Sequence, residues 1–484
     1  MIIGFLSLGC PKNLVDSEVM LGLVQRAGHS LTTDPREAEV LIVNTCAFID
    51  RAKEESIETL LEMAQQKKTG ACRRLIVTGC LAERYRDELR AHIPEIDAVL
   101  GTGDVPHIVN AVGGLGSSNA WVPGRGLPDS AIPLTQVQPD AHVATPVGPP
   151  PIPRALPTYL YDAETPRTLT TPGHFAYVKI AEGCDYACSF CIIPTLRGHY
   201  RSRPSESIVA EARRLVASGV RELILISQDT TFYGIDRRER GALARLLREL
   251  NAIDGLEWIR LLYLYPTTIT DETLAAMAEC DKVCKYVDLP LQHAADRILK
   301  TMKRPGTRKT YEQLLNRIRA RVPTATLRTT FIVGFPGETE RDFDELNDFV
   351  RETRFDHVGV FTYSHEEGTT AHELSDDVPG HEKQRRRNRL MALQRGIVRR
   401  ALQAQIGRHA RVLVDGPAPD HELVIRGRLE GQAPEIDPVV YLTECDPTRL
   451  VPGTFVEAEL VGAREYDLIG RPILSPDPAI FGET

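Results

Sequence analysis

The chain has 484 residues, 42% hydrophobic and 26% charged, which are ordinary values for a globular protein and suggest two to four domains. Its net charge of -8 at pH 7 argues against a protein that relies mainly on phosphate contacts with nucleic acid. The apolar residues 1–10 lack the flanks of a signal peptide, and no apolar run approaches the roughly 20 residues that span a bilayer. We therefore expect a cytoplasmic protein without membrane contact, whose ten cysteines are reduced and available for metal or redox chemistry.

Short apolar strands alternate with helices in residues 1–112. The predicted strands are 2–8, 40–43, 75–77 and 98–100, and the predicted helices are 13–27, 53–66 and 81–92. This alternation is typical of a parallel sheet with both faces covered. Residues 113–172 are rich in Pro and Gly and lack periodicity, which predicts an extended, partly disordered linker.

The alternation returns in residues 173–403, for which we predict a partial (β/α)6 barrel. Its predicted strands are 175–180, 222–227, 258–264, 286–291, 326–333 and 357–363. Six strand–helix units are fewer than the eight of a full barrel. A charged helix at 380–405 leads into residues 404–473, where short strands separated by Gly and Pro predict a small five-stranded barrel. The predicted fold class is therefore α/β, with a C-terminal all-β barrel.

The strongest chemical signal is the run Cys184, Cys188 and Cys191, which follows the first predicted barrel strand. Three thiolates at this spacing can hold one corner of an iron–sulfur cubane and leave one iron open for another ligand. The alternative is a zinc site, which needs a fourth ligand. His199 or Cys280 could be nominated, although neither forms a recognisable zinc motif with the triad.

Cys10, Cys46 and Cys80 each follow a predicted parallel strand of the N-terminal domain. Ligands of open α/β sheets gather at the carboxyl ends of the strands, so the three thiols are expected to converge. The alternative is three buried structural cysteines, but their common register favours a second cluster. We interpret the other four cysteines, for which no such register exists, as packing residues: Cys72, Cys280, Cys284 and Cys445.

The CxxxCxxC element, with an aromatic residue before its last cysteine, resembles the radical S-adenosylmethionine (SAM) superfamily. The resemblance implies that Cys184, Cys188 and Cys191 ligate a cluster whose open iron binds SAM, and that Phe190 lies near the adenine. It further implies SAM contacts at Glu222, where the second strand opens, and at Gly334 and Gly337, after the fifth strand. Glycines at such a place allow close approach of the backbone to a ligand.

With both triads, the chain resembles the methylthiotransferases, which combine an N-terminal cysteine-triad domain, a radical SAM partial barrel and a C-terminal TRAM β-barrel. Residues 7–18, 176–184 and 289–293 are similar to signatures of RimO, the branch that modifies an aspartate of the twelfth protein of the small ribosomal subunit. The resemblance implies two [4Fe-4S] clusters, SAM as methyl donor and as radical source, an electron donor, and methylthio transfer to the aspartate β-carbon. It also suggests substrate contacts at Lys12, Gln292 and His293.

Two other functions compete with this interpretation. A tRNA adenosine methylthiotransferase would have a basic TRAM domain, whereas residues 404–473 contain 12 Asp and Glu, 7 Arg and no Lys. We interpret this acidic balance as suited to a basic ribosomal protein and as unfavourable for tRNA binding. A non-catalytic, zinc-stabilised ribosome-binding factor would not cleave SAM.

Overall fold

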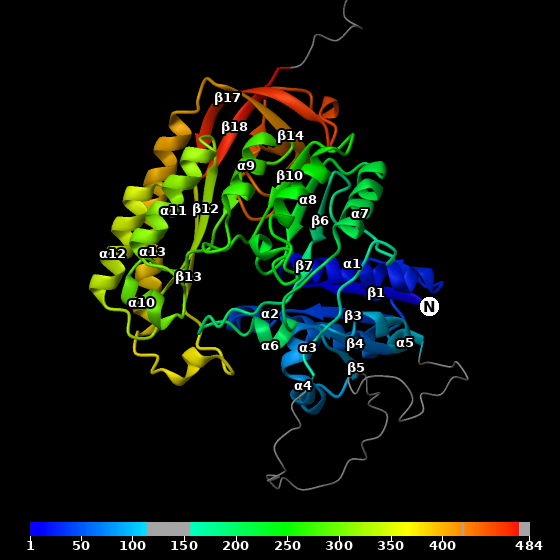
Figure 1. The fold of residues 1–484 in the computed structure, drawn as a ribbon. Helices are drawn as coiled ribbons and strands as arrows, with labels where there is room; N and C mark the ends of the chain where they lie inside the picture. The colour runs from blue at the N-terminus through cyan, green and yellow to red at the C-terminus, as the bar shows by residue number, and fades with distance from the viewer. Residues whose placement is uncertain (114–154, 419–420, 474–484) are drawn as a thin grey trace, which may run out of the picture. The chain divides into compact units, whose positions relative to one another are not determined.

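The computed structural model describes residues 1–113, 155–418 and 421–473, so most of the predicted linker 113–172 lies outside the described residues. The chain divides into two compact units (Figure 1), which are described separately. Unit 1 comprises residues 1–170, 181–203 and 366–369, and unit 2 comprises residues 171–180, 204–365 and 370–484. Among helices in the described ranges, none combines the length and apolarity needed to cross a bilayer.

Unit 1 contains a five-stranded parallel sheet with the strand order β2-β1-β3-β4-β5. The strands are β1 (Ile2–Ser7), β2 (Ser30–Thr32), β3 (Val40–Thr45), β4 (Arg74–Gly79) and β5 (Ile96–Leu100). The helices between and after them are α1 (Pro11–Arg26), α2 (Asp50–Thr69), α3 (Cys80–Arg84), α4 (Arg86–His92) and α5 (Ile108–Gly113). Every residue of β3 and β4 is buried, as expected for central strands of a parallel sheet covered on both faces.

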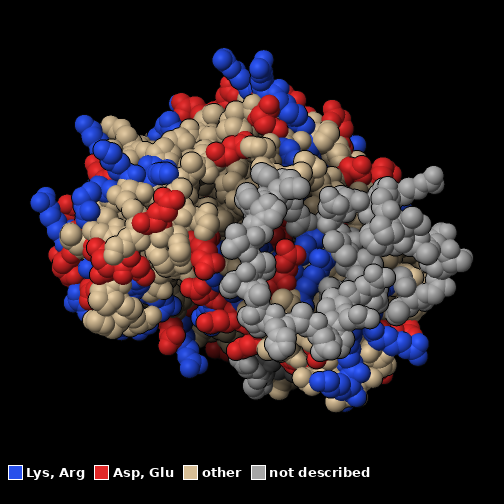
Figure 2. All heavy atoms as spheres, turned by 90° about the horizontal axis from the view of Figure 1, so that it is seen from below, with Lys and Arg blue, Asp and Glu red and all other residues tan. Residues whose placement is uncertain are grey.

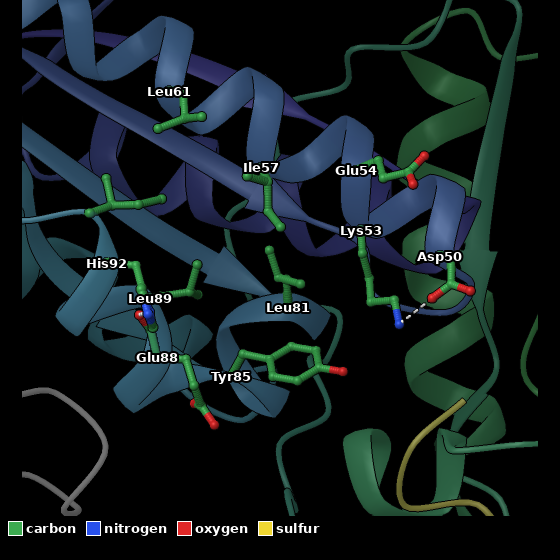
Figure 3. A pocket seen from close by; sticks show the side chains of 11 residues that line it. Asp50, Lys53, Glu54, Ile57, Leu61, Leu81, Tyr85, Glu88, Leu89 and His92 are labelled. Atoms are coloured by element: carbon green, nitrogen blue, oxygen red, sulfur yellow. Dashed lines mark hydrogen bonds and ion pairs between the residues drawn. The ribbon is translucent and has the colours of Figure 1, made fainter. Parts of the chain in front are cut away.

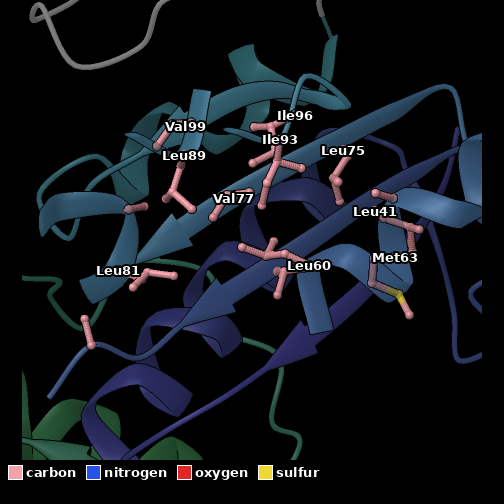
Figure 4. Close-up of a cluster of buried hydrophobic side chains, with 14 of the residues drawn as sticks. Leu41, Leu60, Met63, Leu75, Val77, Leu81, Leu89, Ile93, Ile96 and Val99 are labelled. Atoms are coloured by element: carbon pink, nitrogen blue, oxygen red, sulfur yellow. The ribbon is translucent and has the colours of Figure 1, made fainter. Parts of the chain in front are cut away.

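A cluster of buried side chains joins this sheet to α2, α3 and α4 (Figure 4). Leu60 of α2 and Leu81 of α3 lie in it beside Val77 of β4. The cluster also contains Ile192 and Leu196, which come from the segment around helix α6 (Ile193–Arg197). Because burying each such side chain stabilises the fold by roughly 1.5–3 kcal/mol, these two residues anchor that segment within unit 1.

Unit 2 contains six parallel strands in two three-stranded sheets, β10-β9-β6 and β11-β12-β13, connected by a bridge between Ile259 and Val283. The strands are β6 (Phe175–Lys179), β9 (Glu222–Ile226), β10 (Trp258–Leu261), β11 (Tyr286–Asp288), β12 (Thr326–Val333) and β13 (His357–Thr362). The accompanying helices are α7 (Ser205–Ala217), α8 (Ala242–Asn251), α9 (Asp271–Glu279), α10 (Asp296–Thr301), α11 (Arg308–Arg321), α12 (Glu340–Thr353) and α13 (Gly380–Gln403). The predicted partial barrel is thus confirmed.

A closed barrel with the strand order β14-β15-β16-β18-β17 completes unit 2. Its strands are β14 (His409–Ala418), β15 (His421–Arg428), β16 (Val440–Leu442), β17 (Phe455–Arg464) and β18 (Asp467–Pro472). Val398 and Leu402 of α13 belong to the same hydrophobic core as the barrel strands. The predicted α/β fold with a small C-terminal β-barrel is therefore confirmed, and the closing strand β18 is an addition to the four strands placed from the sequence.

A buried network of charges connects the two parts of unit 2. Arg260 Nε lies 2.7 Å from Glu222 Oε1, and Arg428 Nη1 lies 2.7 Å from Glu222 Oε2. Arg428 also pairs with Asp415, which forms a 2.9 Å hydrogen bond with Nε2 of His174. Burial would raise the pKa of Asp415, but hydrogen bonds with His174 and Arg428 outweigh it and hold the pKa below its ordinary value.

We expect Asp415→Asn to destabilise the protein at pH 7 by roughly 3 kcal/mol, because it removes one partner of a buried ion pair. Since the folded-state pKa of Asp415 is lowered, its stabilisation is present above the unfolded-state pKa of about 4 and is lost as the pH falls through the folded-state value. Urea unfolding at pH 7 and at decreasing pH below 4 should therefore show the variant and the wild type converging. Glu457→Gln, on the exposed side of β17, serves as the control. If the free energies of unfolding of Asp415→Asn and the wild type differ by the same amount at every pH, the assignment is contradicted.

Candidate metal centre

The three N-terminal cysteines lie at the carboxyl edge of adjacent strands. Cys10 follows β1, Cys46 follows β3, and Cys80 follows β4. Parallel pairing of Ser7 with Asn44 and of Thr45 with Gly79 brings the three strand ends level. A Cβ atom on Gly9 would lie 3.0 Å from Cys46 Sγ, which shows how closely the loop of Cys10 approaches Cys46. The structure thus brings together the cysteines predicted from strand register.

Asn13 of α1 holds the loops of this triad in place. Its Nδ2 donates hydrogen bonds to the carbonyl oxygens of Leu8 at 3.1 Å and Thr45 at 2.8 Å, just before Cys10 and Cys46. The Cys80 thiol lies 3.7 Å from Asn13 Oδ1 as a hydrogen-bond donor. One buried amide side chain therefore contacts all three strand ends. Asn13 was not predicted as a site residue, because only its place beside Cys10 distinguishes it in the sequence.

The donor chemistry of this triad suits a metal cluster. Burial and the neighbouring Cys80 and Cys10 raise the pKa of the Cys46 thiol to about 12, and burial also raises the pKa of Cys80. Thiolates that burial disfavours are stabilised by bound cationic iron, since metal binding requires the deprotonated form. In the described part of the chain, no three Cys, His, Asp or Glu side chains are grouped for a single ion. A cubane places three thiolates on three different irons, so it suits a wider arrangement.

The second triad lies on the loop between β7 (Ala181–Glu182) and α6 and belongs to unit 1. The amide of Cys184 donates to the carbonyl oxygen of Gly198 at 3.0 Å, and the amide of Cys191 donates to that of Cys188 at 3.1 Å. Gly183, with φ of +89°, lies where a Cβ would be 2.1 Å from the carbonyl oxygen of His199. This close approach of backbones, which only glycine permits, fixes the start of the loop. All three thiols are partly exposed.

Arg197, the last residue of α6, connects this loop to the first triad. It is 3% exposed, and its Nη2 lies 3.5 Å from Cys80 Sγ and also donates to Asn13 Oδ1. Its Nη1 lies 2.6 Å from Asp16 Oδ2 and 3.4 Å from Glu182 Oε2. Both triads therefore belong to one compact unit. The buried guanidinium of Arg197, on the segment that follows Cys191, contacts the thiol of Cys80. Arg197 was not predicted as a site residue, because nothing in the sequence near Arg197 or Cys80 indicates that the two residues meet.

Glu222, predicted to contact SAM, and His199, nominated as a zinc ligand, both form ion pairs within the protein. Glu222 is the first residue of β9, at the amino end of the strand and fully buried between Arg260 and Arg428. Barrel ligands bind at the opposite, carboxyl ends, so this position is not compatible with the predicted SAM contact of Glu222. His199, nominated as a zinc ligand, is 81% exposed on its side chain and pairs with Asp185 at 2.8 Å.

Gly334 and Gly337 lie beyond the carboxyl end of β12 in unit 2, with φ of +73° and +79°. A Cβ on Gly334 would lie 2.3 Å from Cγ of Lys383, so this glycine accommodates that side chain. The amide of Gly337 donates to Oδ1 of Asp377 at 2.7 Å. Their contacts with SAM, like that of the half-buried Phe190 in unit 1, stay predictions.

The three suggested substrate contacts differ in burial. His293 is fully buried; its Nδ1 accepts a hydrogen bond from the amide of Ala295 at 3.0 Å, and burial lowers its pKa to about 3. It is therefore neutral and packed inside unit 2. Lys12 is also buried, in α1, whereas Gln292 is half-buried with a φ of +73°. The contacts with substrate stay predictions.

A separate apolar groove of about 530 Å³ runs between α2, α3 and α4 (Figure 3). Ile57 and Leu61 of α2 face Leu81 and Leu89 across it, and Tyr85 lies at its edge. None of the six cysteines of the two triads lines this groove. It is therefore distinct from the candidate metal centre.

Comparison with known proteins identifies three consecutive family matches. The uncharacterized protein family UPF0004 matches residues 3–101, the radical SAM superfamily matches residues 178–350, and the TRAM domain matches residues 406–473. A protein of Desulforamulus reducens named ribosomal protein uS12 methylthiotransferase RimO is 49% identical over 97% of this chain and 99% of its own length. The chain belongs to the RimO family. A RimO protein of Symbiobacterium thermophilum is 47% identical over 97% of this chain and 90% of its own length.

Among solved structures, the fold is similar to that of the radical SAM methyltransferase TsrM from Kitasatospora setae. The TM-score is 0.52 at 16% identity, with 74% of this chain and 72% of that chain covered. This likeness concerns the fold alone. It agrees with a RimO-family chain built around a radical SAM barrel.

Proposed function

We propose that this RimO-family chain transfers a methylthio group to the β-carbon of an aspartate in ribosomal protein uS12. The observation that carries the proposal is the presence of two cysteine triads in one compact unit, with Arg197 in contact with Cys80. Relatives that carry the uS12 methylthiotransferase name match nearly the full length of this chain. A sulfur-donating site and a radical-generating site within one unit are what such a reaction requires.

In this proposal Cys184, Cys188 and Cys191 hold the [4Fe-4S] cluster that binds SAM, and Cys10, Cys46 and Cys80 hold a second one. When bound, the first cluster with SAM supplies a radical that breaks an unactivated C–H bond. The protein contributes position: Asn13 connects the strand ends that carry Cys10, Cys46 and Cys80. The Gly183 turn and the buried side chains of Ile192 and Leu196 hold the loop of Cys184, Cys188 and Cys191 against the core of unit 1.

The acidic composition of the TRAM domain lies partly in contacts within unit 2. Four of its acidic residues are turned toward the partial barrel within unit 2: Asp415, Glu430, Glu435 and Asp437. Among the described residues of the TRAM domain, the exposed arginines are Arg408, Arg411, Arg449, Arg464 and Arg471, and the exposed acids are Glu435, Glu444, Asp446, Glu457 and Glu465. The outward charges of the described residues are thus nearly balanced.

The choice of uS12 over tRNA therefore rests on the relatives and not on charge. Figure 2 shows one face of the molecule, on which acidic and basic side chains are interspersed. Strong phosphate binding would call for a clustered basic surface. The tRNA alternative is not favoured by the nearly full-length RimO relatives.

The deciding experiment offers both substrates to the anaerobically reconstituted protein with SAM, a reductant and a sulfide source. We expect mass spectrometry to find a methylthio group on the aspartate of a uS12 peptide and none on undermodified tRNA. Modification of tRNA alone would overturn the substrate assignment. A uS12 peptide whose aspartate is replaced by asparagine serves as the negative control.

A further inference from the structure

We propose that Arg197 raises the reduction potential of the cluster held by Cys10, Cys46 and Cys80. This inference rests on the proposed function, because it requires a cluster on that triad. It assigns Arg197 as a positioning residue that acts through Cys80. Arg197 ends the short helix α6, which follows Cys191. The segment that carries the SAM triad would therefore set the reduction potential of the N-terminal cluster.

Arg197 forms a hydrogen bond with one of the three thiols. The Nη2 atom of Arg197 lies 3.5 Å from Cys80 Sγ, within hydrogen-bonding distance for sulfur. The guanidinium is 3% exposed and Cys80 is 6% exposed, so water does not screen the pair strongly. Among the described residues, Cys80 is the one thiol of this triad that accepts a hydrogen bond from an arginine.

Three further acceptors fix the orientation of the Arg197 guanidinium. Its Nη1 faces Asp16 at 2.6 Å and Glu182 at 3.4 Å, and its Nη2 also donates to Asn13. Asn13 and Asp16 belong to α1, and Glu182 belongs to β7. The planar fork of arginine can serve them and the thiol at once, whereas the single ammonium of lysine cannot keep the same set.

The direction of the effect follows from charge. One-electron reduction adds a negative charge to a cluster, and a hydrogen bond from a cation to a ligand sulfur stabilises that charge. Loss of the arginine would remove this stabilisation and take one positive charge away from Asp16 and Glu182. Both changes lower the potential. A purely structural arginine would affect folding or iron content but would leave the potential of an assembled cluster unchanged.

The test measures the potential of this cluster alone. In a background with Cys184, Cys188 and Cys191 replaced by alanine, the full-length protein is reconstituted anaerobically with iron and sulfide. A redox titration followed by electron paramagnetic resonance then compares the arginine with Arg197→Gln and Arg197→Lys. At the midpoint of the parent protein, we expect Arg197→Gln to reduce the ratio of reduced to oxidised cluster roughly tenfold, a shift of about 59 mV to more negative potential for one electron. Arg197→Lys should shift it in the same direction by less.

Arg201→Lys is the matched control. Arg201 lies on the same segment and donates to the carbonyl oxygens of Arg197, His199 and Tyr159, but to no cysteine in the described structure. Its substitution should leave the potential unchanged. If Arg197→Gln does not fold, Arg197→Lys still decides the question. An unshifted potential in a fully loaded Arg197 variant would overturn the inference and leave the proposed function intact, whereas a background that assembles no cluster would overturn both.

Discussion

Cys188→Ala should abolish the formation of 5′-deoxyadenosine from SAM, with a loss of more than about a hundredfold. Even the loss of a group that only supports a metal ligand costs roughly ten- to a hundredfold, and the loss of a ligand itself should cost more. Cys188 lies in the loop that Gly183 and Gly198 close, and its carbonyl oxygen accepts from the amide of Cys191. Removing its thiol leaves two ligands on that loop. Chromatography of the products after anaerobic incubation with SAM and dithionite measures the effect.

Cys280→Ala is the control for this prediction. Cys280 is also a cysteine of the chain, but it is buried at the end of α9 in unit 2 and belongs to neither triad. We expect its variant to form deoxyadenosine at the wild-type rate. Formation that persists in Cys188→Ala, or that is lost equally in both variants, would contradict the assignment of the triad.

The sequence predicts the edge at which the N-terminal cysteines meet, because parallel strands end together. A regular apolar strand precedes each of Cys10, Cys46 and Cys80, and the β1-β3-β4 order makes these ends neighbours. The three-residue strand β2 was not predicted, since Ser30–Thr32 contains a single apolar residue and is too short to show a period. The boundaries of the main strands differ from the predicted ones by a few residues, as is usual for element ends.

The contacts between distant segments could not be predicted in the same way. Arg197 and Cys80 are 117 residues apart, and nothing local to either residue indicates that they meet. The sequence also does not predict whether a charged side chain faces solvent or the protein interior. Asp415 and Asp437 count toward an acidic TRAM domain in the sequence, but they pair with His174 and with Tyr286 and Arg328 inside unit 2.

The position of Glu222 shows the same limit at a strand. A glutamate at the beginning of an apolar strand can contact a ligand or balance a buried cation, and the sequence does not distinguish these roles. The partner that decides, Arg428, lies on a different domain at β15. Because the register pairs Glu222 with Phe175 and Trp258 at the amino ends of β6 and β10, it lies far along the strands from their carboxyl ends.

Cys46→Ala should separate the two activities of the proposed reaction. We expect SAM cleavage to continue at a rate within about threefold of the wild type, because the Cys184 loop keeps its own anchors, Ile192 and Leu196, in the core of unit 1. Methylthio transfer to the uS12 peptide should fall by at least about a hundredfold, because Cys46 is one of the three thiols proposed to hold the N-terminal cluster. Parallel assays of deoxyadenosine and of the modified peptide measure both effects on one preparation.

Cys72→Ala distinguishes this loss of function from a loss of packing. Cys72 is 5% exposed and Cys46 is 9% exposed, both in unit 1, so the two substitutions remove similar buried groups. Cys72 precedes β4, and its thiol donates to the carbonyl oxygen of Arg74, the first residue of that strand, at the end of the sheet opposite the triad. We expect its variant to keep both activities. If Cys46→Ala instead loses SAM cleavage while Cys72→Ala retains it, the two triads do not function independently. The Arg197–Cys80 contact is then the structural connection through which they would be coupled.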